Sequence, residues 1–248
     1  MIATMHQPEH LPWLGFFHKL RQCEAAVLLD TVQFARRDFQ NRNRIKGANG
    51  PIWLTVPVAS KGSFEQDIEA VAIVDDRDWR RKCWSSMEHS YRRAPHFAEH
   101  RPFFEDLYAR EWTRLVDLNV TIIRYLAGQL GIGTRLVLSS ELGLRARGGT
   151  EVALAACRAV GATTYLSGAF GREYLDESLL AAAGIAVRYQ AFRHPTYPQQ
   201  FGEFLPQLSA VDLLFNCGPG SGAVLDAADA APEAQPAPAP LPGAPGAP

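Results

Sequence analysis

The chain has 248 residues, of which 47% are hydrophobic, and its formal net charge is −1. It is long enough to bury a sizeable core, and its near-neutral charge gives no general electrostatic argument for binding nucleic acid or a membrane surface. The N-terminus lacks the basic start and apolar core of a signal peptide, and the apolar runs are too short to span a membrane. We therefore expect a cytoplasmic protein without membrane insertion.

Apolar runs typical of strands alternate with helical patterns along the chain. The predicted strands span residues 2–6, 25–30, 52–58, 68–74, 134–139, 163–168 and 185–192. The predicted helices span residues 13–22, 78–92, 97–130 with breaks, 150–160 and 174–183. This alternation indicates an α/β fold of Rossmann-like type, in which helices flank a mostly parallel sheet.

The composition predicts one domain and a tail. Residues 1–217 contain no linker that would divide them, and an irregular polar lobe is expected around residues 31–66. From residue 218 to residue 248 the sequence is rich in Pro, Ala and Gly, a composition that buries too little apolar surface to offset chain entropy. We expect this tail to be disordered.

The first predicted strand is followed by special residues. His6 and Gln7 stand at its carboxyl end, where parallel sheets collect their ligands, and Pro8 and Pro12 stiffen the connection to a helix that carries Lys19. We predict that His6, Gln7 and Lys19 belong to a functional site. The alternative is that His6 and Gln7 only satisfy backbone groups at a turn.

The second predicted strand also ends in polar residues. Asp30 and Gln33 follow it, and a basic and amide-rich run comes next, with the candidate ligand-binding residues Asn41, Arg42, Asn43, Arg44 and Lys46. Such side chains hold phosphate or carboxylate groups. A solvated basic loop is the alternative. RNA binding is disfavoured because stacking aromatics are sparse, with only Phe34 and Phe39 nearby.

Several long motifs resemble the WbqC-like family. They are HQPEHLPWLGFF, LLDTVQF, FQNRNRIKGANGPIWLTVPV, YRRAPHF, VLSSEL, YLSG, FRHPTYPQQF and LSAVDLLFNCG, and together they span about residues 2–218. The resemblance implies a role in a biosynthetic pathway, because the family is associated with gene clusters for O-antigen and other surface polysaccharides. This sequence has His10 where the family pattern usually has tyrosine, so a contact of that ring hydroxyl is altered here.

A more distant likeness concerns the HUP class, which includes nucleotidylyltransferases and pantothenate synthetase. The spacing of His10, Gly15 and His18 resembles their histidine-bearing loop without matching it, and the pair Ser139 and Ser140 resembles a late serine motif that binds phosphate. This likeness implies a HUP-like variant of the fold. It leaves ATP with magnesium open as a cofactor.

The second half supplies further candidates after predicted strands. Ser139 and Ser140 can contact a ligand, or Ser140 can simply cap a helix. His194, Tyr197 and Gln199 are held between prolines, an arrangement that suits substrate binding or proton transfer, with a surface turn as the alternative. No histidine pattern with tight metal-ligand spacing is present, so no metal site is expected.

These residues favour a cytoplasmic group transferase or ATP-dependent ligase. It would modify an activated small molecule, such as an aminosugar or sugar nucleotide, for surface-polysaccharide or natural-product biosynthesis. In this hypothesis His6 or His194 transfers a proton, Asp30 orients a donor or cation, and the basic run holds phosphate. The competing hypothesis is a non-catalytic module that binds a sugar nucleotide or a partner. A carrier protein or a second copy of the chain is left open as a partner.

Overall fold

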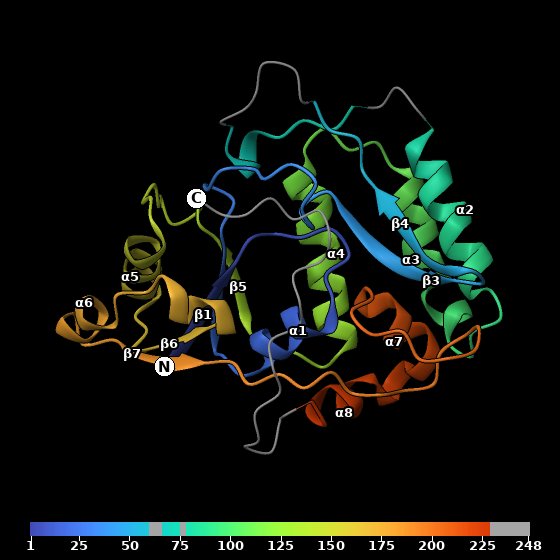
Figure 1. Cartoon of the computed structure of the whole chain (residues 1–248). Coiled ribbons are helices and arrows are strands. Elements are labelled where there is room, and N and C mark those ends of the chain that lie inside the picture. The colour runs from blue at the N-terminus through green and yellow to red at the C-terminus, as the bar shows by residue number, and fades with distance from the viewer. Residues whose placement is uncertain (60–65, 75–77, 229–248) are drawn as a thin grey trace.

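Five parallel strands form the central sheet of the computed structural model (Figure 1). The structure describes residues 1–59, 66–74 and 78–228. In chain order the strands of this sheet are β1 (Ile2–His6), β2 (Ala25–Leu28), β5 (Arg135–Leu138), β6 (Thr164–Ser167) and β7 (Ala186–Tyr189). Their spatial order is β5-β2-β1-β6-β7, the order of a doubly wound α/β sheet. The prediction of an α/β fold with a mostly parallel sheet is confirmed.

One face of the sheet packs against the helices that follow β5 and β6. Because successive side chains of a strand point to opposite faces, Ala3, Met5 and Val27 all reach this side. They share an apolar core with α5 (Gly149–Val160), and α6 (Glu177–Ala182) adds Leu180 to it.

The other face packs against a larger set of helices. Ala26 and Leu28 share a core there with α1 (Leu14–Arg21), α4 (Leu115–Gln129) and α7 (Ala210–Cys217). Burial of both faces explains why the strands are short, nearly continuous apolar runs. The polar residues His6 and Ser167 stand at the last positions of β1 and β6, at the carboxyl edge.

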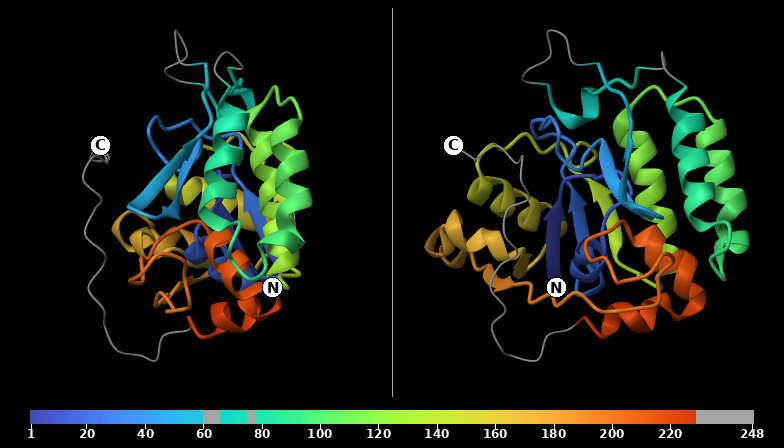
Figure 2. Two further views of the ribbon diagram at one scale, coloured as in Figure 1. Left: turned by 90° about the vertical axis from the view of Figure 1, so that its right-hand side faces the viewer. Right: turned by 45° about the vertical axis from the view of Figure 1, so that its right-hand side comes forward.

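A second layer extends this side of the molecule. The hairpin of β3 (Arg42–Gly47) and β4 (Gly50–Thr55) packs against α2 (Trp79–Tyr91), and α3 (Phe97–Ala109) lies beside α2 (Figure 2). The predicted helix 97–130 is divided into α3 and α4 by residues 110–114, as the expected breaks indicated.

Two strand predictions are corrected by the structure. The predicted strand 52–58 does not join the parallel sheet, because its part within β4 pairs antiparallel with β3, so the polar lobe contains a regular hairpin. The predicted strand 68–74 is a short 3-10 helix, η1 (Ile68–Ala70), followed by isolated bridges. Ile68 and Val71 enter the core, while the amides of the segment bond to several different segments, including the carbonyls of Val32 and Asp30.

The ordered chain also continues beyond the predicted boundary at residue 218. Residues after Cys217 form η3 (Gly218–Gly220) and α8 (Ser221–Asp226), and Leu225 is fully buried in the core. A single well-placed leucine lets this Ala- and Gly-rich segment dock. The rest of the predicted tail, residues 229–248, lies outside the described residues.

The connection from β1 to α1 is fixed by a buried amide of α4. Asn119 is fully buried, and its Nδ2 donates to the carbonyls of Pro8 (2.9 Å) and Gln40 (2.7 Å). Its Oδ1 lies 3.3 Å from Nδ1 of His10, which is also fully buried. One side chain thus ties the loop after β1 to the segment before β3.

Replacing this amide is expected to destabilise the protein. An Asn119→Ala variant leaves two carbonyls without their donor inside the fold, so its free energy of unfolding should fall by about 2–4 kcal/mol. Urea denaturation measures this change. The control is Gln129→Ala, at an exposed position of the same helix, which should change the value by less than about 0.5 kcal/mol. Equal stability of the two variants would contradict the proposed stabilisation of the loop after β1 by Asn119.

Candidate functional site

The carboxyl edge of the sheet contains a point at which the connections diverge. The chain passes from β1 to β2 on one side, whereas β6 and β7 lie on the other side of β1. Loops that leave β1 and β6 therefore turn apart, and in α/β sheets this switch point is where ligands bind. His6 ends β1, and Ser167 and Gly168 end β6, before η2 (Ala169–Glu173). A Cβ added to Gly168 would meet no atom within 4 Å, so space is open above it.

Three titratable side chains gather at the end of β1, and we call them the His6–Glu9–Lys19 cluster. Nδ1 of His6 lies 3.6 Å from Oε1 of Glu9 and 3.0 Å from the carbonyl of Gln7. Lys19, on α1, donates from Nζ to the carbonyl of Met5 at 3.1 Å. Glu9 and Lys19 are buried, while the His6 side chain is 24% exposed and gives the cluster contact with solvent.

Burial shifts all three pKa values toward the neutral form of each group. The pKa of Glu9 is raised to about 8, mainly by burial and further by the nearby Asp38, while Lys19 opposes the shift. Burial lowers the pKa of Lys19 to about 8, although Glu9 acts in the other direction. The pKa of His6 is lowered by burial and by the charge of Lys19.

This arrangement is suited to proton transfer. Two groups titrate near neutral pH, and such shifts are typical of catalytic acids and bases. Because Glu9 and Lys19 interact, their protons are lost in steps that belong to the pair. Oε2 of Glu9 is buried and has no hydrogen-bond partner among the described residues. Within the cluster, this oxygen is therefore available for a further hydrogen bond.

Asp30 has a different environment at the end of β2. Its Oδ1 accepts from Oγ of Ser139 (2.7 Å) and from the amide of Ser140 (2.9 Å), and its Oδ2 accepts from Oγ of Ser140 (2.5 Å). Oγ of Ser139 in turn accepts from the amides of Asp30 and Thr31. The structure thus brings Asp30, Ser139 and Ser140 together, in a network that links the end of β2 to the end of β5.

His194 has backbone groups and aromatic rings as its neighbours. Its Nδ1 lies 2.9 Å from the carbonyl of Pro195, and its Nε2 accepts from the amide of Gln207 at 3.1 Å. Its ring also packs near Tyr197 and Phe204. Within the part of the chain that the structure describes, no hydrogen bond or ring contact joins His194 to His6 or Asp30.

Lys46 and Gln199 lie in a second buried network, and Tyr197 is buried with its hydroxyl unpaired among the described residues. Nζ of Lys46 donates to Oε1 of Gln199 (3.0 Å) and to the carbonyl of Glu203. Nε2 of Gln199 donates to Oδ2 of the fully buried Asp212 at 2.8 Å. These contacts fasten β3 to α7 and the segment before it, which is a structural use of the charged groups.

The remaining predicted residues divide between loop contacts and the hairpin. Oε1 of Gln7 accepts from Nε2 of Gln40, which holds Gln7 beside the cluster. Gln33 is exposed, and its backbone forms an isolated bridge with Asp67. Nδ2 of Asn41 donates to the carbonyl of Val56.

On β3, side chains alternate between the two faces of the hairpin. Asn43 is fully buried and accepts from the amide of Arg44, whereas Arg42 and Arg44 are partly exposed. The basic run is therefore divided between the interior and the surface. Its two partly exposed arginines share the outer face.

Glu9 was not among the residues predicted for the site. It lies between Pro8 and Pro12 directly after a strand, and this position was the available signal. The sequence gives no sign of its burial, which depends on the packing of residues far along the chain. The structure thus adds Glu9 to the predicted residues His6, Gln7 and Lys19.

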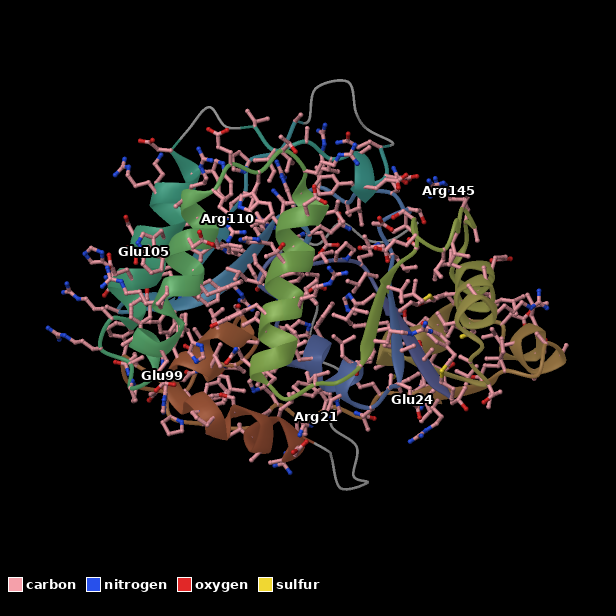
Figure 3. The ribbon with its side chains drawn as sticks, turned by 180° about the vertical axis from the view of Figure 1, so that it is seen from behind. Arg21, Glu24, Glu99, Glu105, Arg110 and Arg145 are labelled. Atoms are coloured by element: carbon pink, nitrogen blue, oxygen red, sulfur yellow. The ribbon has the colours of Figure 1, made fainter. Side chains whose placement is uncertain are left out.

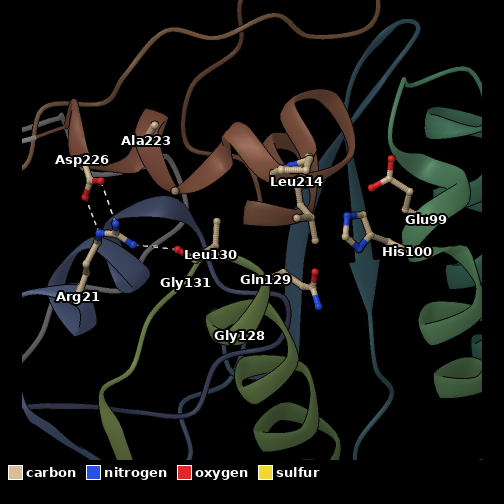
Figure 4. A pocket seen from close by; sticks show the side chains of 13 residues that line it. Arg21, Glu99, His100, Gly128, Gln129, Leu130, Gly131, Leu214, Ala223 and Asp226 are labelled. Atoms are coloured by element: carbon tan, nitrogen blue, oxygen red, sulfur yellow. Dashed lines mark hydrogen bonds and ion pairs between the residues drawn. The ribbon is translucent and has the colours of Figure 1, made fainter.

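The cavity in Figure 4 lies at the opposite edge of the sheet. It has a volume of about 460 Å³ and is lined in part by Arg21 and Asp226, which form an ion pair, and by His100. Figure 3 shows Arg21 at the edge opposite Arg145, which follows β5. None of the predicted site residues lines this cavity.

The matched region of the chain decides its family. Residues 7–223 match the WbqC-like protein family. The chain belongs to this family. An uncharacterized protein of Mycobacterium tuberculosis, Rv1507c, is 38% identical over 216 residues, which are 86% of this chain and 92% of that protein. The resemblance identified from the motifs is thereby confirmed.

The WbqC-like region contains the buried cluster and its supports. Its first residue is Gln7, next to His6, and it includes Glu9, Lys19 and Asn119. His10, which also lies in this region, is fully buried, and burial lowers its pKa to about 4. It therefore acts as a neutral hydrogen-bonding partner of Asn119 in this member.

The described part of the WbqC-like chain has neither a clustered set of metal ligands nor a membrane-spanning helix. Within residues 1–59, 66–74 and 78–228, no group of three or more His, Cys, Asp and Glu side chains is placed to hold a metal ion. No helix in those residues combines the length and apolar character needed to cross a bilayer.

The raised pKa of Glu9 predicts a specific dependence of stability on pH. The folded protein binds this proton more tightly than the unfolded chain, so its stabilising effect is full below about pH 4.5 and is lost as the pH rises to about 8. Relative to Glu9→Gln, the wild type should lose up to about 1.4 kcal/mol of unfolding free energy per pH unit in this range. Urea denaturation at several pH values measures the difference.

A control separates this effect from other titrations. Glu105 is an exposed residue of α3 whose side chain pairs only at the surface with Arg101, so Glu105→Gln should keep the wild-type dependence on pH. Parallel curves for wild type and Glu9→Gln would show that Glu9 titrates normally in the folded protein.

The network around Asp30 predicts a loss of stability. Asp30→Ala leaves two serine hydroxyls and one amide without their acceptor, and the free energy of unfolding should fall by about 3 kcal/mol. Ser140→Ala removes only one donor and should cost about 1 kcal/mol. Chemical denaturation compares them, and an Asp30→Ala protein as stable as Ser140→Ala would contradict the central position of Asp30.

Proposed function

We propose that this WbqC-like protein is a biosynthetic enzyme that transfers a group to or from an activated small molecule. The observation that carries the proposal is the His6–Glu9–Lys19 cluster. It places two groups with pKa values of about 8 at the carboxyl end of β1, beside the switch point of the sheet.

Glu9 has the central role in this proposal. Its carboxylate accepts the proton that an attacking amine or hydroxyl loses, and its protonated form gives a proton to the leaving oxygen. Lys19 is fixed by the Met5 carbonyl, so its charge acts from a constant position on Glu9. His6 is the partly exposed member and would contact the substrate as a neutral imidazole.

We assign different roles to Asp30 and His194, the other two predicted catalytic residues. Asp30 orients the end of β2 through Ser139 and Ser140. His194 has both ring nitrogens next to backbone groups, so Glu9 is the better candidate for the proton-transfer role that the sequence suggested for His194.

Membership of the family supports a pathway assignment within the proposal. We infer a cytoplasmic enzyme of surface-polysaccharide or natural-product biosynthesis that acts on an aminosugar or a sugar nucleotide. Transfer from a nucleotide sugar and ATP-dependent ligation both require proton transfer at the nucleophile, so the cluster serves either reaction. The reaction mixtures that test the proposal contain substrates for both reactions.

A non-catalytic module that binds a sugar nucleotide is the competing function. It requires no titratable group at the switch point, whereas an enzyme requires one. The burial of Glu9 beside Lys19 favours the enzyme, because a binding site gains little from a carboxyl group that is hidden from solvent and lacks a hydrogen-bond partner.

Turnover in a Glu9→Gln variant tests the proposal. Purified full-length protein is incubated with nucleotide sugars, or with ATP, magnesium and aminosugars or amino acids, and products are detected by mass spectrometry. Loss of the proton-transfer group should lower kcat by about 100-fold or more and remove a transition near pH 8 from the rate profile.

The control variants distinguish chemistry from folding. Glu105→Gln, on the outer surface of α3 (Figure 3), and His194→Gln should keep kcat within about threefold of the wild type if they fold normally. Wild-type turnover in Glu9→Gln would contradict the proposal. Bound ligand without product in any reaction mixture would favour the binding module.

A further inference from the structure

An exposed tryptophan on the β3–β4 hairpin lies among arginines. Trp53 is 42% exposed and pairs in register with Arg44 on the neighbouring strand. The guanidinium carbons of Arg42 and Arg44 lie 4.4 Å and 5.6 Å from the centre of its ring. Arg42, Arg44 and Trp53 form the outer face of the hairpin, which we call the Trp53 face.

The charges of this face are not neutralised by the protein. Arg42 donates to the carbonyl of Arg37, and Arg44 donates to the carbonyl of Gln207. In the described parts of the chain neither arginine forms an ion pair with a carboxylate. Residues 36–46 contain five cationic side chains and one acidic side chain, although the whole chain has a net charge of −1. The positive charge is therefore local.

A groove adjoins Trp53 on the side of α2. It has a volume of about 250 Å³, and its lining includes Trp53, Thr55, Trp79 and Lys82. Lys82 is exposed and adds a cation on this side. A groove of this volume accommodates part of a small molecule rather than a folded partner.

The Trp53 face is connected to the His6–Glu9–Lys19 cluster through residues 38–40. The rings of Phe39 and Trp53 are 6.1 Å apart, and the carbonyl of Phe39 accepts from the amide of His10. Asp38, the residue before Phe39, acts electrostatically on Glu9. One short segment therefore borders both the aromatic face and the cluster.

We propose that the Trp53 face binds the nucleoside diphosphate part of the activated substrate. The base stacks on the indole of Trp53, and the positive charges of Arg42 and Arg44 bind the phosphates. The group to be transferred then extends along residues 38–40 toward Glu9. This inference rests on the proposed function, because it assigns the part of the substrate that the cluster does not contact.

Binding of UDP, ADP and inorganic pyrophosphate to the full-length protein tests the inference without requiring turnover. Titration calorimetry should show that Arg42→Gln with Arg44→Gln weakens all three ligands by at least about tenfold. Trp53→Ala should weaken UDP and ADP by about tenfold and leave pyrophosphate unchanged, whereas Trp53→Phe, which keeps a ring, should bind all three within about threefold of the wild type.

A matched charge control uses arginines outside this face. Arg135 and Arg188 are exposed on β5 and β7, so Arg135→Gln with Arg188→Gln loses the same charge and should retain binding. Equal loss in both double variants would overturn the inference, because it would show a response to net charge alone. Absence of UDP and ADP binding to the wild type would also overturn it.

Further outcomes distinguish nucleotide binding at the Trp53 face from nucleic-acid binding and from the proposed catalytic role of Glu9. A single-stranded oligonucleotide that binds more than about tenfold tighter than UDP would overturn the assignment to a small molecule. Glu9→Gln should bind UDP as the wild type does, so normal binding without any turnover would refute the proposed function alone. Turnover that persists in the Arg42 and Arg44 double variant, without nucleotide binding, would refute this inference alone.

Discussion

The burial of Glu9 next to Lys19 is the constraint on which the candidate site depends. A carboxyl group and an amine in the same low-polarity region each favour their neutral form, yet each stabilises the charged form of the other. The result is a pair that titrates near neutral pH. This balance persists only while the loop after β1 stays in place, and Asn119 of α4 holds that loop through two backbone carbonyls.

Many polar residues of this protein have structural partners that account for them. Asp30 accepts three hydrogen bonds from two serines, His194 is held between two backbone groups, and Lys46 has an amide and a carbonyl as partners. Their charges and rings are used to fasten segments that are distant in sequence. Glu9 differs because one of its oxygens is buried without a partner.

The Trp53 face and the cluster belong to different parts of the fold. The first lies on a hairpin outside the parallel sheet, and the second lies at the end of β1. A stacking surface on one element and an acid or base on another allow one protein to bind the constant part of a substrate at a distance from the bond that changes. The segment from Asp38 to Gln40 joins the two, because Phe39 contacts Trp53 and Gln40 contacts Gln7.

The sequence by itself determined the fold class, because short apolar strands and amphipathic helices differ in period and follow each other along the chain. It also determined the family, and it directed attention to the segment from His6 to Lys19, since strand ends of a parallel sheet meet at one edge. The tertiary structure alone decided the burial of Glu9, the hydrogen bonds of Asp30 with Ser139 and Ser140, and the hold of Asn119 on the loop after β1. These depend on contacts between residues far apart in sequence, which no local pattern of residues specifies.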